Sequence, residues 1–288
     1  MYLFSFLSLY GAKLRTQYII KDLFVKKRQT GEDNFIFTLV DLDRNTGRAL
    51  QKPNNMGNFS REEIESKIKQ APMVPLFTHH DIDVAKAVVH ACYSGGVRVF
   101  EYTNRSANSG EVFKAMIEWV RPNYADLALG IGTIYNRQQA TQYAELGADF
   151  IIQPVVDAGV ADVCAHYQLA WMPGAMTLTE IWTARQLGAG IVKIFPAATV
   201  GPGFIKAILG PMPDAKLMAT GGVEPTADSL TTWFSAGSHC VGMGSQLFSR
   251  EVLEKKDYQA LAASVRDCLQ IIADIQPLST AAPAASST

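Results

Sequence analysis

The stretch Ile191-Val192-Lys193-Ile194-Phe195-Pro196 places one lysine in the middle of an otherwise apolar segment. Glycines precede the segment and Pro196 ends it, so the pattern predicts a short buried β-strand. Because successive side chains of a strand point to opposite faces, Lys193 shares its face with Ile191 and Phe195. Burial disfavours the charged ammonium and lowers the pKa of a lysine from about 10.4. Lys193 is therefore a candidate amine nucleophile for a carbonyl substrate, with a structural lysine paired to a carboxylate as the alternative.

Seven further segments repeat this pattern of a short apolar strand, and a segment with helical spacing follows each one. The strands are predicted at 73–77, 97–103, 127–133, 150–155, 170–176, 191–196, 216–220 and 239–243. Helical crossovers make neighbouring strands parallel, so eight strand–helix units with short connections predict an α/β fold, a compact (β/α)8 TIM barrel. A doubly wound open sheet is the alternative, but Gly130-Ile131-Gly132 lacks the third glycine of a dinucleotide-binding fingerprint.

The predicted barrel domain, residues 59–275, opens with an extra N-terminal helix ahead of the first strand. Ser60 and Glu63 have the spacing of a capping box, in which each side chain accepts a hydrogen bond from the other residue's backbone N–H. Ile64 and Ile68 then supply the apolar face of this helix.

Two terminal segments fall outside the strand–helix pattern. We interpret residues 1–58 as an N-terminal extension of unknown role that need not be native, with Met56 as a natural start and one candidate strand at 35–42. Residues 276–288 are rich in Ala, Ser, Thr and Pro, a composition that predicts a disordered tail.

Composition and charge exclude several classes of protein. The formal net charge of −1 gives no reason to expect a nucleic-acid or anionic-membrane partner. The apolar run Tyr2–Tyr10 is much shorter than the ~20 residues that a membrane-spanning helix needs. The four cysteines are far apart and lack the spacing of a zinc site or redox pair, which predicts free thiols in a reducing, cytoplasmic setting.

Polar residues gather where the second predicted strand ends, at the mouth expected for the active site of a TIM barrel. Glu101, Thr103 and Arg105 alternate with other residues, so they share one face of the strand. The second and sixth strands lie opposite each other in an eight-stranded ring, which places Glu101 across the interior from Lys193. A structural ion pair between Glu101 and Arg105 is the alternative. The same argument adds to this pocket the residues near the ends of the third and fourth strands, Thr133 and Pro154.

Glycine-rich turns follow the last two strands, where barrels of this class commonly bind phosphate. Thr220-Gly221-Gly222 ends the seventh strand and Gly244-Ser245 follows the eighth. Glycines let backbone N–H groups approach an anion closely, so these turns are the candidate phosphate site. His79 and His80 follow the first strand and are interpreted as rim residues, and we predict no metal site because the other strand ends supply no further ligand set.

Several of these motifs, in this order and spacing, resemble the 2-keto-3-deoxy-6-phosphogluconate (KDPG) and 4-hydroxy-2-oxoglutarate (KHG) aldolases. The matching segments are VRVFEYTNR (97–105), GIGTIYN (130–136), Pro173-Gly174, VKIFPA (192–197), TGGV (220–223) and GMGS (242–245). The resemblance covers residues 73–248 and leaves out the N-terminal extension. It implies a class I aldolase, without metal or cofactor, that cleaves a keto-deoxy sugar acid to pyruvate and an aldehyde. It also implies a homotrimer and a place in carbohydrate metabolism of the Entner–Doudoroff type or in hydroxyproline-type metabolism.

The resemblance also assigns roles to residues of this sequence. Lys193 matches the Schiff-base lysine and Glu101 the carboxylate that transfers protons. The positions matched to substrate binding are Arg105, Thr133 and Pro154 around the pyruvate carboxylate and the lysine, Phe195 beside the lysine, and Thr220, Gly221, Gly222, Gly244 and Ser245 at the phosphate end. This chain departs from the family in having Gln153-Pro154-Val155 where Ser-Pro-Gly is common.

Two other functions are compatible with the residues alone. A metal-dependent epimerase of the same fold would lose activity with a chelator, and a non-catalytic barrel would bind a sugar acid without turning it over. The presence of both Glu101 and Lys193 favours the aldolase over the binding protein.

Overall fold

The computed structural model describes residues 23–29, 35–41 and 57–279 and divides the chain into two compact units, Met1–Pro53 and Asn54–Thr288. In the first unit, β1 (Leu23–Gln29) pairs antiparallel with β2 (Phe35–Asp41). The strand predicted at 35–42 is therefore confirmed, whereas β1 was not predicted.

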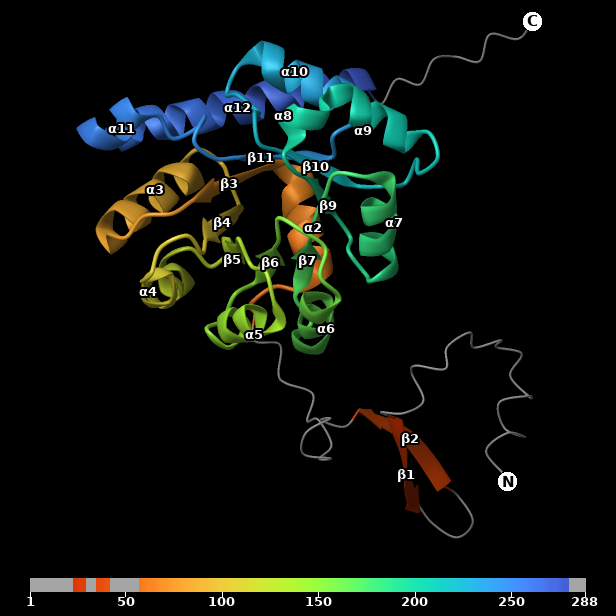
Figure 1. Ribbon diagram of the computed structural model, residues 1–288. Helices are drawn as coiled ribbons and strands as arrows, with labels where there is room; N and C mark the ends of the chain where they lie inside the picture. The colour runs from red at the N-terminus through yellow and green to blue at the C-terminus, as the bar shows by residue number, and fades with distance from the viewer. Residues whose placement is uncertain (1–22, 30–34, 42–56, 280–288) are drawn as a thin grey trace, which may run out of the picture. The chain divides into compact units, whose positions relative to one another are not determined.

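The second unit is the predicted (β/α)8 barrel, with strands inside and helices outside (Figure 1). The sheet order is β7-β6-β5-β4-β3-β11-β10-β9-β8, and every neighbouring pair is parallel. The strands are β3 (Met73–Phe77), β4 (Val99–Thr103), β5 (Ala128–Gly132), β6 (Phe150–Ile152), β7 (Ala170–Met172), β8 (Gly174–Ala175), β9 (Val192–Ile194), β10 (Leu217–Thr220) and β11 (Cys240–Met243).

The fifth predicted strand is split into β7 and β8, which form the two ends of the sheet order and join them through Pro173. Pro173 lies between β7 and β8 and has no N–H group to continue the ladder. β7 pairs with β6 on one side, while β8 pairs with β9 on the other. The Pro173 carbonyl still accepts a hydrogen bond of 2.8 Å from the backbone N–H of Lys193, so the break lies beside the lysine.

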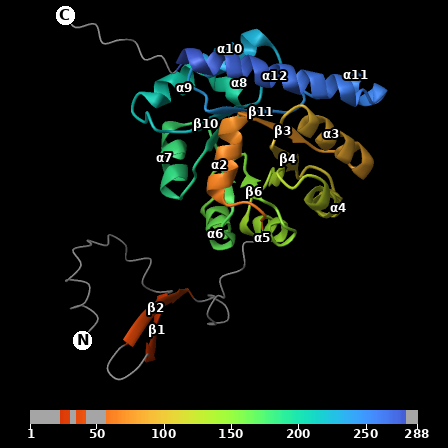
Figure 2. The same cartoon turned by 180° about the vertical axis from the view of Figure 1, so that it is seen from behind.

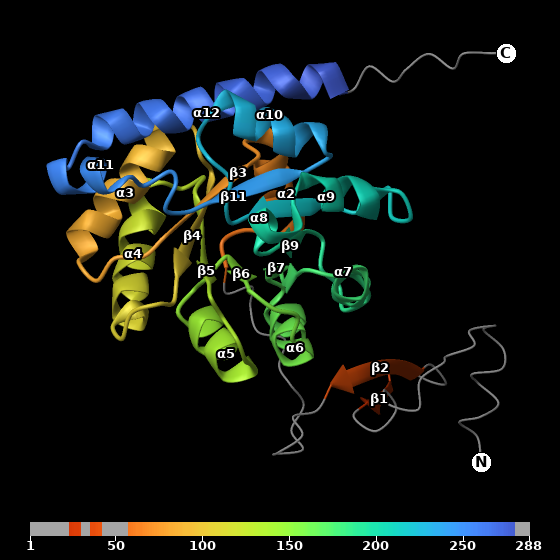
Figure 3. The same cartoon turned by 45° about the horizontal axis from the view of Figure 1, so that its top comes forward.

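The helices follow the strands as predicted, with two additions. They are α2 (Arg61–Gln70), α3 (Ile82–Ser94), α4 (Ser109–Asn123), α5 (Arg137–Glu145), α6 (Ala158–Tyr167), α7 (Leu178–Gln186), α8 (Ala197–Val200), α9 (Pro202–Leu209), α10 (Ala227–Ser235), α11 (Arg250–Lys255) and α12 (Tyr258–Ser279). The short helices α8 and α11 were not predicted. α12 lies along α3 and α10 and continues past the predicted end at residue 275 (Figure 3), while the rest of the predicted tail, 280–288, lies outside the described residues.

The extra helix α2 closes the N-terminal end of the barrel. Its capping box of Ser60 and Glu63 forms as predicted. Ile64 and Ile68 are fully buried in one cluster with the first inward-facing residues of the strands, such as Val99 of β4. Figure 2 shows α2 crossing the centre of the ring of strands. Val97, which lies within the strand predicted at 97–103, instead precedes β4 and packs in the layer between strands and helices.

Within the described part of the chain, no helix has the length and apolar character needed to cross a bilayer. All four cysteines are free and buried inside the second unit.

Candidate active site

A lysine and a carboxylate are buried together inside the barrel. Lys193 is the central residue of β9 and is 4% exposed, while Glu101 is the central residue of β4 and is 1% exposed. Counting β7 and β8 as one split strand, β4 and β9 are four places apart in a ring of eight, so they face each other across the interior. The structure therefore brings the two residues into one site, as the sequence predicts.

Burial disfavours the charged form of both groups in this site. It raises the pKa of Glu101, against the opposing effect of the cations Lys193 and Arg105. It lowers the pKa of Lys193, and the Glu101 carboxylate opposes that shift. Neither carboxylate oxygen of Glu101 has a hydrogen-bond partner among the described residues. The alternative of a hydrogen-bonded structural pair between Glu101 and Arg105 is therefore not what the structure shows, and the carboxylate is available to a ligand.

The absence of a side chain at Gly132, the last residue of β5, makes room for Glu101. A Cβ atom built at this position would overlap the Oε1 atom of Glu101. Glu101 and Gly130 are neighbours in the pairing of β4 with β5, so the carboxylate leans toward the end of the adjacent strand.

We expect Gly132→Ala to lower the free energy of unfolding by about 1–3 kcal/mol, because the methyl group forces Glu101 out of its place in a packed interior. Denaturant unfolding measures this loss. Gly203→Ala in α9 is the matched control, because a Cβ atom there meets no heavy atom within 4 Å. Alanine in a helix should leave stability unchanged or raise it by up to about 1 kcal/mol. Equal stability of the two variants would contradict the packing described for Glu101.

Arg105 and Thr133 meet beyond the ends of β4 and β5. The guanidinium Nε of Arg105 donates a long hydrogen bond of 3.4 Å to the hydroxyl oxygen of Thr133. Thr133 has a φ of 61°, a left-handed conformation that costs a β-branched residue roughly 1–2 kcal/mol. Strain of this kind persists where the surrounding structure imposes it, and it is often found at binding sites.

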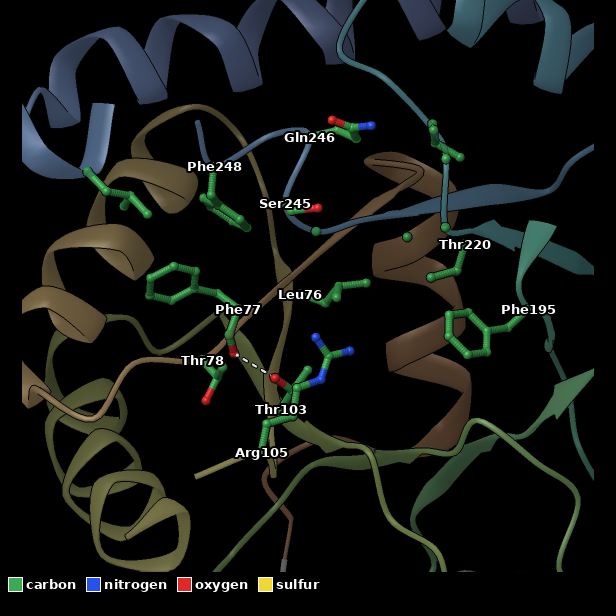
Figure 4. A pocket seen from close by; sticks show the side chains of 16 residues that line it. Leu76, Phe77, Thr78, Thr103, Arg105, Phe195, Thr220, Ser245, Gln246 and Phe248 are labelled. Carbon is green, nitrogen blue, oxygen red and sulfur yellow. Dashed lines mark hydrogen bonds between the residues drawn. The ribbon is translucent and has the colours of Figure 1, made fainter. Parts of the chain in front are cut away.

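A cavity of about 360 Å³ lies at the carboxyl ends of the strands (Figure 4). This is within the usual size range for small-molecule sites. The Arg105 guanidinium points into it, with Phe195 on the opposite side (Figure 4). The predicted substrate-binding residues that line it are Arg105, Phe195, Thr220, Gly221, Gly222, Gly244 and Ser245.

The four other predicted site residues are outside the lining of this cavity: Lys193, Glu101, Thr133 and Pro154. The ammonium nitrogen of Lys193 lies 5.0 Å from the ring centroid of Phe195, so the aromatic ring connects the buried lysine to the cavity wall. Phe195 is therefore the residue of the cavity lining that lies beside Lys193.

The turn after β10 is shaped for an anion. Gly221 and Gly222 have φ values of 89° and 87°, which non-glycine residues rarely adopt. A Cβ atom at Gly222 would also collide with the side chain of Ala198. The backbone of this turn therefore reaches the cavity without covering side chains, an arrangement that suits a phosphate.

Some lining residues were not predicted. Phe77 and Phe248 pack with ring centroids 4.9 Å apart and form an apolar wall with Leu76 and Leu253. Thr78 also lines the cavity, and its hydroxyl oxygen is buried without a hydrogen-bond partner among the described residues. Thr78 could have been predicted from its position directly after a barrel strand. Phe248 lies in a loop and Leu253 in α11, and no sequence pattern places either of them at the cavity.

His79 and His80 follow β3 and stack on each other with ring centroids 4.6 Å apart. The backbone N–H of Asp81 donates to Nδ1 of His79 at 3.1 Å. Neither histidine lines the cavity, which fits the prediction of rim residues. Within the described ranges, no three His, Cys, Asp or Glu side chains are grouped as a metal site would require.

A buried lysine, a buried carboxylate without a hydrogen-bond partner among the described residues and a glycine-rich turn at the mouth of a parallel barrel are typical of (β/α)8 enzymes that form a lysine Schiff base. The chain belongs to the KDPG and KHG aldolase family, whose model matches residues 64–264.

Individual relatives agree with this family. The chain is 31% identical over 197 residues to the 2-dehydro-3-deoxy-6-phosphogalactonate aldolase of Escherichia coli, a match that covers 68% of this chain and 93% of the relative. It is 32% identical over 193 residues to the 2-dehydro-3-deoxy-phosphogluconate aldolase of Pseudoalteromonas atlantica, covering 67% and 87% of the two chains. A solved structure of native KDPGal superposes with a TM-score of 0.64 at 27% identity, over 70% of this chain and 96% of that one.

Proposed function

We propose that this protein is a class I aldolase that cleaves 2-keto-3-deoxy-6-phosphogluconate, 4-hydroxy-2-oxoglutarate or both to pyruvate and an aldehyde. The aldehyde is glyceraldehyde 3-phosphate from the first substrate and glyoxylate from the second. The observation that carries the proposal is the buried pair of Lys193 and Glu101 on opposite strands of one barrel. Family membership favours this function over the epimerase and the binding protein.

The proposed chemistry uses the directions of the two pKa shifts, lowered for Lys193 and raised for Glu101. The neutral amine of Lys193 attacks the C2 carbonyl of the keto acid, and loss of water gives a protonated imine. The C3–C4 bond then breaks, its electrons pass to the imine, and the C4 hydroxyl gives its proton to Glu101, directly or through a water. Glu101 returns a proton to C3 of the resulting enamine, and hydrolysis of the imine releases pyruvate and restores the Lys193 amine.

Arg105 binds the substrate carboxylate in this proposal. A guanidinium can hold a carboxylate with two parallel hydrogen bonds, a geometry that a lysine cannot reproduce. Because Arg105 lines the cavity and is close enough to influence the charge of Lys193, it can hold the keto acid with its carbonyl toward the lysine.

Borohydride reduction in the presence of pyruvate and a chelator tests the proposal directly. The expected product carries one reduced pyruvate adduct, located on Lys193 by peptide mass mapping. A second measurement of aldol cleavage in the chelator separates this enzyme from a metal-dependent one. An adduct on another lysine, a need for divalent metal, or binding without turnover would each contradict the proposed function.

We expect the phosphorylated keto-deoxy acid to react better than its unphosphorylated analogue. Hydrogen bonds to a charged group contribute roughly 1.5–3 kcal/mol each, so several from Gly221, Gly222 and Ser245 would raise kcat/KM on the order of a hundredfold. Steady-state kinetics with the two substrates measures this ratio, and equal kcat/KM values would remove the phosphate site from the proposal.

We propose a homotrimer as the assembled state. Six large hydrophobic side chains of the described residues are exposed, and all lie between residues 135 and 187: Tyr135, Val155, Met176, Leu178, Trp182 and Leu187. Exposed apolar side chains mark an interface where they form one contiguous patch, and the proposal is that these six do so. We expect Trp182→Glu, at the most exposed of these residues, to shift the protein from trimer to monomer in analytical ultracentrifugation. A wild-type monomer at micromolar concentration would contradict the assembly.

The catalytic unit in this proposal is residues 59–275, since every proposed site residue lies between Glu101 and Ser245. A reducing, cytoplasmic location is supported by the four buried free cysteines. A role in carbohydrate metabolism of the Entner–Doudoroff type is supported by the sugar-acid aldolases among the relatives.

A further inference from the structure

Gln153, which directly follows β6, is a fully buried polar residue that the proposed mechanism does not use. Its side-chain carbonyl accepts a hydrogen bond of 2.7 Å from the indole N–H of Trp171 on β7. Its side-chain amide donates one of 3.2 Å to the backbone carbonyl of Ile134. The backbone N–H of Gln153 donates to Met172, so both its main chain and its side chain are fixed.

These contacts connect β7 to the loop that follows β5. Ile134 is the residue next to Thr133, and its side chain is fully buried. Thr133 holds the strained left-handed φ of 61° and accepts the hydrogen bond from Arg105. A β-branched residue keeps such a conformation only where its neighbours hold the backbone, and the bond from Gln153 to Ile134 is one such restraint.

We infer that Gln153 is a positioning residue for the carboxylate-binding end of the site. It fixes the carbonyl of Ile134, which keeps the Thr133 hydroxyl in reach of Arg105 and so orients the guanidinium. Gln153 has a dual requirement as donor to Ile134 and acceptor from Trp171, which a side-chain amide meets and an ionised carboxylate or a hydrocarbon does not. This role rests on the proposed function, because it concerns the group that binds the carboxylate of the keto acid.

The test compares a ketone that has a carboxylate with one that lacks it. In Gln153→Met, we expect the concentration of pyruvate for half-maximal borohydride trapping at Lys193 to rise about 10–30-fold. Trapping of hydroxyacetone, which has no carboxylate, should change less than twofold. With the full keto-acid substrate, KM should rise while kcat stays within about threefold. Trp171→Phe, which removes one of the two bonds and keeps an aromatic ring, should show a smaller rise of about 3–5-fold and serves if Gln153→Met does not fold.

Two comparisons separate positioning from a general loss of stability. Arg121→Met removes the ion-pair partner of buried Asp149, which precedes β6 and also accepts a hydrogen bond from Leu129 of β5. This contact lies at the N-terminal ends of β5 and β6, whereas Gln153 and Ile134 follow their carboxyl ends, so the change should leave the pyruvate dependence unchanged. In an Arg105→Lys background, Gln153→Met should raise the half-maximal pyruvate concentration less than twofold, since both changes act on one contact.

The possible results are distinguishable. Equal effects of Gln153→Met on pyruvate and hydroxyacetone, equal effects of Gln153→Met and Arg121→Met, or full additivity with Arg105→Lys would each overturn the positioning role. Failure of the unaltered protein to form any pyruvate adduct at Lys193 would overturn the proposed function itself, and the inference with it.

Discussion

Lys193→Met is expected to lower aldol cleavage by on the order of 10⁴–10⁶-fold, the range seen when a nucleophile is removed from an enzyme. The thioether side chain is close to lysine in length and suits the buried face of β9, where the lysine is only 4% exposed. The variant should fold because it replaces a buried amine, which pays for desolvation, with an apolar chain. Circular dichroism and a thermal melt check the fold, and residual kcat/KM measures the loss.

The matched control for this change is Lys206→Met on α9. Lys206 is exposed and is not part of the cavity lining, so its removal should leave cleavage and borohydride trapping unchanged. Pyruvate adducts should disappear only from Lys193→Met. Retention of aldol cleavage in a folded Lys193→Met protein would exclude the Schiff-base mechanism.

Glu101→Gln is expected to separate imine formation from proton transfer. The amide keeps the size of the carboxylate but cannot act as a base near neutral pH. Loss of a positioned acid–base group typically lowers rates by about 10²–10⁴-fold. Aldol cleavage should therefore fall by that factor, while pyruvate can still be trapped on Lys193.

Exchange of the pyruvate methyl protons in D₂O isolates the proton-transfer step, because it needs no aldehyde. NMR should show exchange falling by the same 10²–10⁴-fold in Glu101→Gln. Glu111→Gln, at an exposed position of α4, is the control and should exchange at the wild-type rate. Wild-type exchange in a folded Glu101→Gln protein would assign the proton to another group, and His79 or His80 would be the next candidates.

Local patterns were sufficient to predict most of the barrel. Period-2 alternation identified the faces of β4 and β9, and the ring geometry then placed Glu101 opposite Lys193. Such arguments work because side-chain direction in a strand depends only on position along it.

Contacts between segments that are distant in the sequence could not be predicted from local patterns. Nothing local to Pro173 indicates that the strands on its two sides pair with different neighbours. The overlap that a side chain at Gly132 would make with Glu101 joins residues on separate strands. The contacts of Gln153 with Trp171 and Ile134 likewise depend on the assembled barrel, so the sequence showed only an unusual residue there.

α2 covers the N-terminal end of the barrel, and the cavity lies at the carboxyl ends of the strands. Lys193 is buried beside Phe195 of the cavity lining, so we expect a substrate bound to it to hold its pyruvate half inward and its aldehyde half toward the mouth. In the proposed mechanism pyruvate stays covalently attached to Lys193 after the C3–C4 bond breaks, so we expect the aldehyde to leave first. In the direction of synthesis we therefore expect an ordered bi-reactant reaction, with pyruvate as the leading substrate.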